Sequence, residues 1–138
     1  MAEEVLVDTV ALVALTNSRD VYHAEAKAVQ ASLVADGARF LTTDWILAEF
    51  LNAMSPVAWR SAAARAVAAM RASSLYTVAP ADRAGWDSAL ELYTQRQDKE
   101  WSLIDCVSVL HCRTRGIRRV FTADRHFVQA GFRILLGS

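Results

Sequence analysis

Short apolar runs alternate with longer amphipathic segments along this chain. Most of the apolar runs span three or four residues and end at polar or turn-forming residues, as expected of buried strands. We therefore predict about five strands, at Val5–Val7, Phe40–Thr42, Leu75–Val78, Val120–Thr122 and Arg133–Leu135. Strands that alternate with helices are typical of an α/β/α sandwich, in which helices cover both faces of a mostly parallel sheet. We predict this architecture for residues 1–138 as a single domain.

The segments between the predicted strands have apolar residues at helical spacing. Helices are predicted over Thr9–Leu15, over Val21–Ala35, from a cap at Thr43 or Asp44 to Met54, from Pro56 to about Ala72, over Ala81–Gln95 and over Leu103–Arg115, with a short turn at Phe127–Gly131. Within Ala81–Gln95, we expect Trp86, Leu90 and Tyr93 to point towards the core. The helices then connect parallel strands by the usual right-handed crossovers.

One predicted helix, within Trp101–Cys112, is apolar on almost every side and therefore belongs in the core. Asp105 lies inside it, and a carboxylate next to a core needs a cation, a hydrogen-bond network or a raised pKa. A structural role is available, because Ser102-x-x-Asp105 resembles a capping box with Ser102 as the N-cap. A role in a functional site is the alternative.

The composition is that of a globular, soluble protein. Hydrophobic residues make up 54% of the chain, charged residues make up 22%, and the formal net charge is zero. The apolar runs are far shorter than a membrane span. Met-Ala-Glu-Glu at the start places acids where a signal peptide has positive charge, so we expect a cytoplasmic protein. Cys106 and Cys112 face different directions on one predicted helix and are expected to be reduced.

Four carboxylates map to one edge of the predicted sheet. Asp8 and Asp124 come directly after the first and fourth strands, Asp105 opens the helix before the fourth strand, and Glu49 lies about one and a half turns into the helix after the second strand. In open parallel sheets, ligands bind beyond the carboxyl ends of the strands. We therefore expect these side chains to converge there.

Each of these acids also has a local structural interpretation. Asp8 is a possible helix cap, Glu49 a possible surface residue, and Asp124 a possible turn residue beside Arg125. The functional interpretation depends on all four acids mapping to one edge. Oxygen ligands without a supporting cluster of His or Cys suit Mg²⁺ or Mn²⁺ better than Zn²⁺.

Basic residues are concentrated near the C-terminus, where six arginines lie between His111 and Ser138 against a single acid. They could face the phosphates of a nucleic acid, or they could simply occupy a helix C-terminus, where the helix dipole favours positive charge. Arg113 and Arg115 fit the second interpretation, and Arg125 does not. Arg125 and His126 could bind RNA phosphate or be structural, and both alternatives remain open.

Four segments of the chain together resemble the PIN domain family and, more narrowly, the VapC-type toxins, which are the ribonucleases of bacterial toxin–antitoxin pairs. The segments are Val7–Thr9, Leu47–Asn52, Asp98–Cys106, and Phe121–Phe127 followed by Gly131-Phe132. They are distributed over nearly the whole chain. The last two are the more specific, because their order and separation also fit the family.

The resemblance implies a set of site residues and a reaction. The catalytic and metal-binding residues would be Asp8, Glu49, Asp105 and Asp124, supported by Thr9, Ser102 and Thr122. They would hold Mg²⁺ or Mn²⁺ and cleave RNA. The cation would activate a water molecule for in-line attack on phosphorus and stabilise the leaving 3′-oxygen. The products would have 5′-phosphate and 3′-hydroxyl ends.

The resemblance also implies partners. They are an RNA substrate, a small antitoxin that often fills the acidic groove with a basic side chain, and a second copy of the chain in a homodimer. Two other functions remain open. One is a housekeeping PIN nuclease without an antitoxin, which the absence of a small neighbouring gene would favour. The other is a non-catalytic module whose acids hold a structural cation or bind a partner, which acid-dependent cleavage of RNA would exclude.

Overall fold

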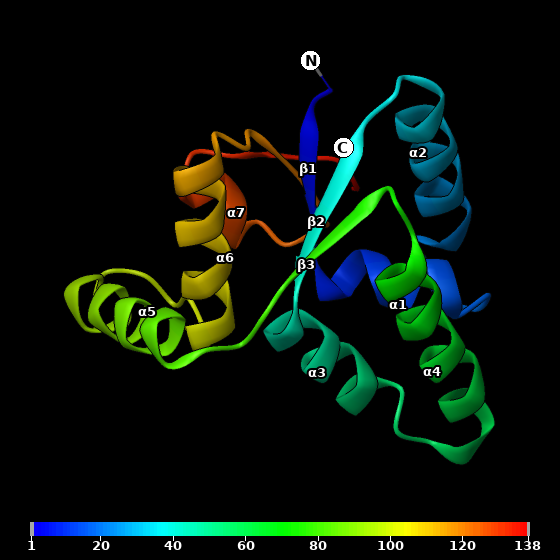
Figure 1. The fold of residues 1–138 in the computed structure, drawn as a ribbon, viewed down its shortest axis with the longest axis horizontal. Helices are drawn as coiled ribbons and strands as arrows, with labels where there is room; N and C mark the ends of the chain where they lie inside the picture. The colour runs from blue at the N-terminus through cyan, green and yellow to red at the C-terminus, as the bar shows by residue number, and fades with distance from the viewer. Residues whose placement is uncertain (1, 138) are drawn as a thin grey trace.

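The computed structural model describes residues 2–137, which form a five-stranded parallel sheet with the strand order β3-β2-β1-β4-β5 (Figure 1). The strands are β1 (Glu4–Val7), β2 (Arg39–Thr43), β3 (Tyr76–Ala79), β4 (Arg119–Phe121) and β5 (Arg133–Ile134). The helices are α1 (Thr9–Thr16), α2 (His23–Ala35), α3 (Asp44–Ala53), α4 (Val57–Ala72), α5 (Arg83–Gln95), α6 (Leu103–Arg115) and α7 (His126–Gln129). The predicted α/β/α sandwich is confirmed.

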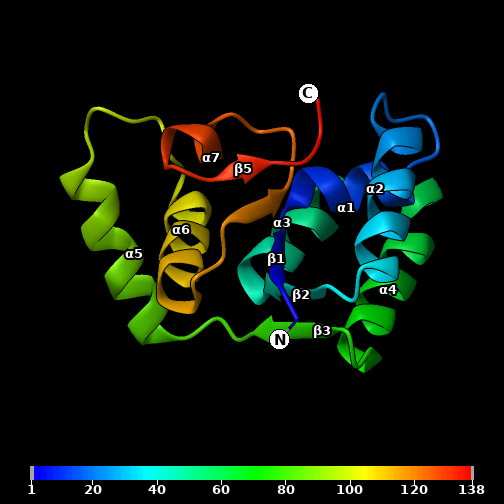
Figure 2. The same ribbon diagram turned by 90° about the horizontal axis from the view of Figure 1, so that it is seen from above.

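Helices cover both faces of the sheet. α1, α2 and α4 lie on one side, α6 and α7 lie on the other, and α5 packs outside α6 (Figure 1 and Figure 2). β1 occupies the centre, so the chain first builds β2 and β3 on one side of it and later adds β4 and β5 on the other. The strand order therefore reverses between β1 and β4. This is the switch point at which open parallel sheets place their ligand sites, beyond the carboxyl ends of the strands.

The central strands are buried on both faces. Val5, Leu6 and Val7 have no exposed surface, and neither do Val120 and Phe121 of β4. Continuous apolar strands of this kind are expected where helices cover both sides of a parallel sheet. The polar residues that follow β1 and β4 are therefore attached to fully buried strands.

The prediction that Trp86, Leu90 and Tyr93 of α5 face the core is wrong. Their exposed fractions are 41%, 43% and 50%, whereas Ala89 and Leu92 are buried. α5 packs mainly against α6 and not on the sheet (Figure 2). The face of α5 that carries Ala89 and Leu92 makes this contact, and the larger aromatic side chains remain exposed.

Several element boundaries also differ from the predicted ones by one or two residues. α2 begins at His23 rather than Val21, because the preceding residues form a turn in which Asp20 Oδ1 accepts a hydrogen bond of 2.9 Å from the backbone N–H of Tyr22. The short helix α7 overlaps the turn predicted at residues 127–131 and begins one residue before it, at His126. α6 ends as predicted, at Gly116 with φ of 69°, a conformation that favours glycine.

The arginines near the C-terminus lie mostly at the amino end of the sheet. Arg113 and Arg115 are in the last turn of α6, and β4 and β5 begin at Arg119 and Arg133. Two of the arginines are paired near the start of the chain, Arg115 with Glu4 at 2.6 Å and Arg119 with Glu3 at 2.5 Å. This basic region is therefore at the end of the sheet opposite to the predicted acids.

Both cysteines are buried, free thiols. Burial raises the pKa of the Cys112 thiol to about 12, so it remains protonated and packs as a small apolar residue. Within residues 2–137, no helix combines the length and the apolar character needed to cross a membrane.

Candidate active site

Asp8 lies at the carboxyl end of β1, at the N-cap position of α1. Its side chain makes no capping hydrogen bond and accepts instead from the hydroxyl of Thr122, with 2.9 Å between Oδ2 and Oγ1. The residue is only 4% exposed. The pKa of Asp8 is raised to about 7, mainly by burial and with a smaller contribution from the carboxylates of Asp105 and Glu49, while the hydrogen bonds from Thr122 and from the backbone of Thr9 oppose the shift. Asp8 is therefore a buried carboxyl group near two other acids.

Thr122 connects two of the four predicted acids. While its hydroxyl donates to Asp8, the same oxygen accepts a hydrogen bond of 3.1 Å from the backbone N–H of Asp124. Thr122 is fully buried at the end of β4. One hydroxyl thus fixes the end of β1 relative to the loop that carries Asp124.

Glu49 is half-buried on α3 and accepts a hydrogen bond from the hydroxyl of Thr9, the first residue of α1. α3 is held at its start by Thr43, whose side chain accepts from the backbone N–H of Ile46 at 3.1 Å. The contact between Thr9 and Glu49 joins residues forty positions apart. It directs Glu49 towards the segment that follows β1, where Asp8 lies.

Asp105 forms the capping box considered for it from the sequence and also contacts His126. Its backbone N–H donates to Ser102 Oγ at 3.0 Å, and its Oδ2 accepts from the backbone N–H of Ser102 at 3.1 Å, which completes a capping box. The same Oδ2 lies 3.2 Å from Nδ1 of His126. The cap therefore fixes the carboxylate in an orientation that faces the loop after β4.

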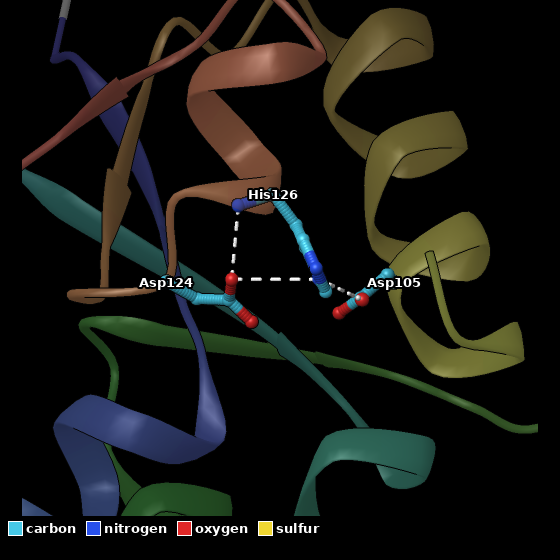
Figure 3. A group of neighbouring side chains, drawn as sticks. All are labelled: Asp105, Asp124 and His126. Carbon is cyan, nitrogen blue, oxygen red and sulfur yellow. Dashed lines mark hydrogen bonds and ion pairs between the residues drawn. The ribbon is translucent and has the colours of Figure 1, made fainter. Parts of the chain in front are cut away.

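His126 lies between Asp105 and Asp124 (Figure 3). Its Nδ1 is 3.5 Å from Asp124 Oδ1, and its backbone N–H donates to that same oxygen at 2.9 Å. One ligand atom from each of these three side chains lies within 4.8 Å of the other two. The sequence left open whether His126 binds phosphate or is structural, and the structure directs the imidazole at the acids. Arg125, by contrast, is exposed.

The four predicted acids are connected but do not form one compact group. Asp105 and Asp124 meet at His126, whereas Asp8 and Glu49 lie outside that group of three and are held by Thr122 and Thr9. Asp8 is nevertheless close enough to Asp105 and Glu49 for their charges to raise its pKa. Within residues 2–137, no Lys or Arg forms an ion pair with any of the four. Oxygen donors with uncompensated negative charge fit a hard divalent cation such as Mg²⁺ or Mn²⁺.

Replacing Asp8 by asparagine is expected to stabilise the metal-free protein, and more so at higher pH. The pKa of Asp8 is about 7 in the folded protein, against the ordinary value of 3.8 that applies in the unfolded chain. The contribution of the Asp8 carboxyl group to stability is therefore complete below about pH 4 and is lost as the pH rises towards 7. In EDTA, the advantage of Asp8→Asn should grow by at least about 1 kcal/mol between about pH 5 and about pH 8. Urea denaturation measures this, with Asp87→Asn on the exposed face of α5 as the control. An advantage that stays constant with pH would contradict the expectation.

Replacing Ser102 by alanine is expected to destabilise the protein by about 1 kcal/mol, because it removes the acceptor for the backbone N–H of Asp105. Ser108, on the same helix, is a matched control, because its buried hydroxyl has no hydrogen-bond partner among the described residues. Ser108→Ala should be neutral or stabilising. Equal losses for the two variants in denaturant titrations would show that the capping box adds nothing.

Comparisons with known proteins agree with this geometry. The model of the PIN domain family matches residues 5–133. A search of curated proteins finds no match. Among solved structures, the chain is similar to VapC20 of Mycobacterium tuberculosis, described as a toxin that cleaves the sarcin–ricin loop, with a TM-score of 0.82 and 28% sequence identity over 93% of this chain and 95% of that one. The chain therefore belongs to the PIN domain family and is a VapC-type member of it.

Proposed function

We propose that this protein is a metal-dependent endoribonuclease and the toxin of a toxin–antitoxin pair. The observation that carries the proposal is the set of acids at the switch point of a PIN domain. Asp8, Glu49, Asp105 and Asp124 come from four separate segments, and no Lys or Arg among residues 2–137 forms an ion pair with them. Uncompensated carboxylates destabilise a fold, so a site of this kind is best explained by the cation that it binds.

Different residues of the chain have different roles in the proposed site. When bound, a divalent cation lowers the pKa of a water molecule and neutralises charge on the scissile phosphate. Asp105 and Asp124 present the more accessible carboxylates, and Asp8 adds a buried one beneath them. Thr122 and Ser102 hold Asp8 and Asp105 in fixed orientations, which avoids a cost of reorganisation during the reaction. The exposed Arg125 is adjacent to Asp124 and is suited to bind an RNA phosphate.

The proposed partners follow from the same site and from the similarity to VapC20. A toxin of this class needs an RNA substrate and an antitoxin protein, and a basic side chain of the antitoxin suits the acidic site. We also propose a homodimer, to which the exposed residues of α5 could contribute apolar surface. VapC20 is described as cleaving the sarcin–ricin loop, which makes this RNA loop a reasonable first substrate to test.

Substitution of the acids is expected to abolish cleavage while the protein stays folded. Purified protein incubated with total RNA and Mn²⁺ or Mg²⁺ should yield fragments with 5′-phosphate ends. Asp105→Asn and Asp124→Asn should reduce the rate at least about a hundredfold, as removal of one group that stabilises developing charge does. EDTA should stop the wild-type reaction, and added Mn²⁺ should restore it. Asp87→Asn on α5 is the control for an exposed acid.

Equal cleavage by the wild type and these variants would indicate a contaminating nuclease and would reject the proposal. Binding of a divalent cation without any cleavage would favour the non-catalytic module instead. Circular dichroism of each variant separates a loss of chemistry from a loss of fold.

The toxin role makes a separate prediction about growth. Expression of the chain alone should arrest growth of the host cell, and co-expression of the proposed antitoxin, sought as a small gene beside this one, should restore growth. Arrest should disappear with Asp105→Asn, because it depends on the same site. RNA ends mapped during arrest identify the target. Normal growth with active enzyme would favour the housekeeping nuclease.

A further inference from the structure

We propose that His126 is a direct ligand of the divalent ion through Nδ1, so that the site prefers Mn²⁺ to Mg²⁺. This inference rests on the proposed function, because it concerns the ion of the same site. It starts from the direction of the imidazole, which lies between the carboxylates of Asp105 and Asp124 (Figure 3).

The distances from Nδ1 of His126 to the two carboxylates are close to those between neighbouring ligands of one ion. Nδ1 of His126 lies 3.2 Å from Asp105 Oδ2 and 3.5 Å from Asp124 Oδ1. An octahedral ion with ligands at about 2.1 Å places adjacent ligand atoms about 3 Å apart. All three ligand atoms lie within 4.8 Å of one another. Small side-chain movements are therefore enough to bring one nitrogen and two oxygens onto a single ion.

The backbone fixes the imidazole in this position. The backbone N–H of His126 donates to Asp124 Oδ1 at 2.9 Å, so the two residues are held together by a contact that does not involve the ring. The next residue, Phe127, is 1% exposed and anchors the start of α7 in the core. With the backbone held on both sides, the ring points back to the acids, and Nδ1 is the nitrogen that faces them.

The identity of this ligand atom decides which ion is favoured. Mg²⁺ prefers oxygen ligands and keeps much of its water, whereas Mn²⁺ lies in the transition-metal series whose ions accept imidazole nitrogen. A site made only of carboxylates discriminates weakly between the two. One nitrogen ligand shifts the preference towards Mn²⁺.

The competing explanation is that Nδ1–H only donates a hydrogen bond to Asp105, while the ion binds other carboxylate oxygens. In that arrangement the imidazole orients a ligand but never contacts the metal. The two explanations differ in an observable way, because a coordinated nitrogen is coupled far more strongly to the unpaired electrons of Mn²⁺ than a nearby nitrogen that is not a ligand, and the ¹⁴N coupling meant below is the strong one.

His126→Asn is the informative variant, because its amide oxygen takes nearly the position of Nδ1 and can ligate either ion. His111→Gln, at a half-buried histidine further along α6, is the matched control. Mn²⁺ and Mg²⁺ affinities are measured by calorimetry without RNA, and pulsed electron paramagnetic resonance of the bound Mn²⁺ detects coupling to ¹⁴N. We expect ¹⁴N coupling in the wild type and in His111→Gln, and none in His126→Asn.

The ratio of Mn²⁺ to Mg²⁺ affinity should fall about tenfold in His126→Asn, a change of the size caused by loss of one supporting group at a metal site. Bound Mn²⁺ without ¹⁴N coupling in the wild type would overturn the inference, and so would an unchanged affinity ratio in the variant. In either case, RNA cleavage by the wild type would leave the proposed function standing. Failure of the wild type to bind either ion would reject both.

Discussion

The buried hydrogen bond between Thr122 and Asp8 is the interaction on which the site depends. It joins Thr122, which follows β4, to Asp8, which follows β1, at the point where the strand order of the sheet reverses. The same hydroxyl accepts from the backbone of Asp124, and Asp124 in turn accepts from the backbone of His126. The imidazole then reaches Asp105 at the start of α6. One series of contacts therefore fixes residues that extend from the end of β1, at the centre of the sheet, to the start of α6, on its face.

These contacts hold negative groups together against their mutual repulsion. The cost falls mainly on Asp8, which is buried among apolar strands and has a raised pKa. The fold offsets this cost with fully buried central strands and with a helix start whose backbone groups are satisfied by Ser102 and Asp105. Asp105 contributes both to the repulsion, as a charge near Asp8, and to the stabilisation, as part of the capping box of α6. The capping box does not exclude the role proposed for Asp105 in the site, because the hydrogen bond from the backbone N–H of Ser102 holds the carboxylate where it also contacts His126.

The sequence was sufficient to predict the strands, the layers and the edge at which the acids lie. Buried strands in a parallel sheet are continuous apolar runs, and the residues that follow them must lie at the carboxyl end. The orientation of α5 was not predictable in the same way. Helical spacing shows that Trp86, Leu90 and Tyr93 share a face, but it does not show which neighbour covers that face.

The direction of His126 also required the structure. It depends on Asp105, which is 21 positions away, and on the start of α7, where only a turn was predicted. The hydrogen bond between Thr9 and Glu49 spans 40 positions and has no local signal. Contacts of this kind are set by packing, so the sequence indicated which residues were candidates and left their mutual arrangement open.

The two ends of the sheet differ in how their charges are paired. At the amino end, Arg115 and Arg119 pair with Glu4 and Glu3, whereas no Lys or Arg among residues 2–137 forms an ion pair with the carboxylates of Asp8, Glu49, Asp105 and Asp124 beyond the other end. A polyanion that approaches the carboxyl end therefore meets negative groups that no neighbouring Lys or Arg offsets, and it is repelled there. A divalent cation held as proposed would remove this barrier, so the ion would have to enter before a nucleic acid could follow.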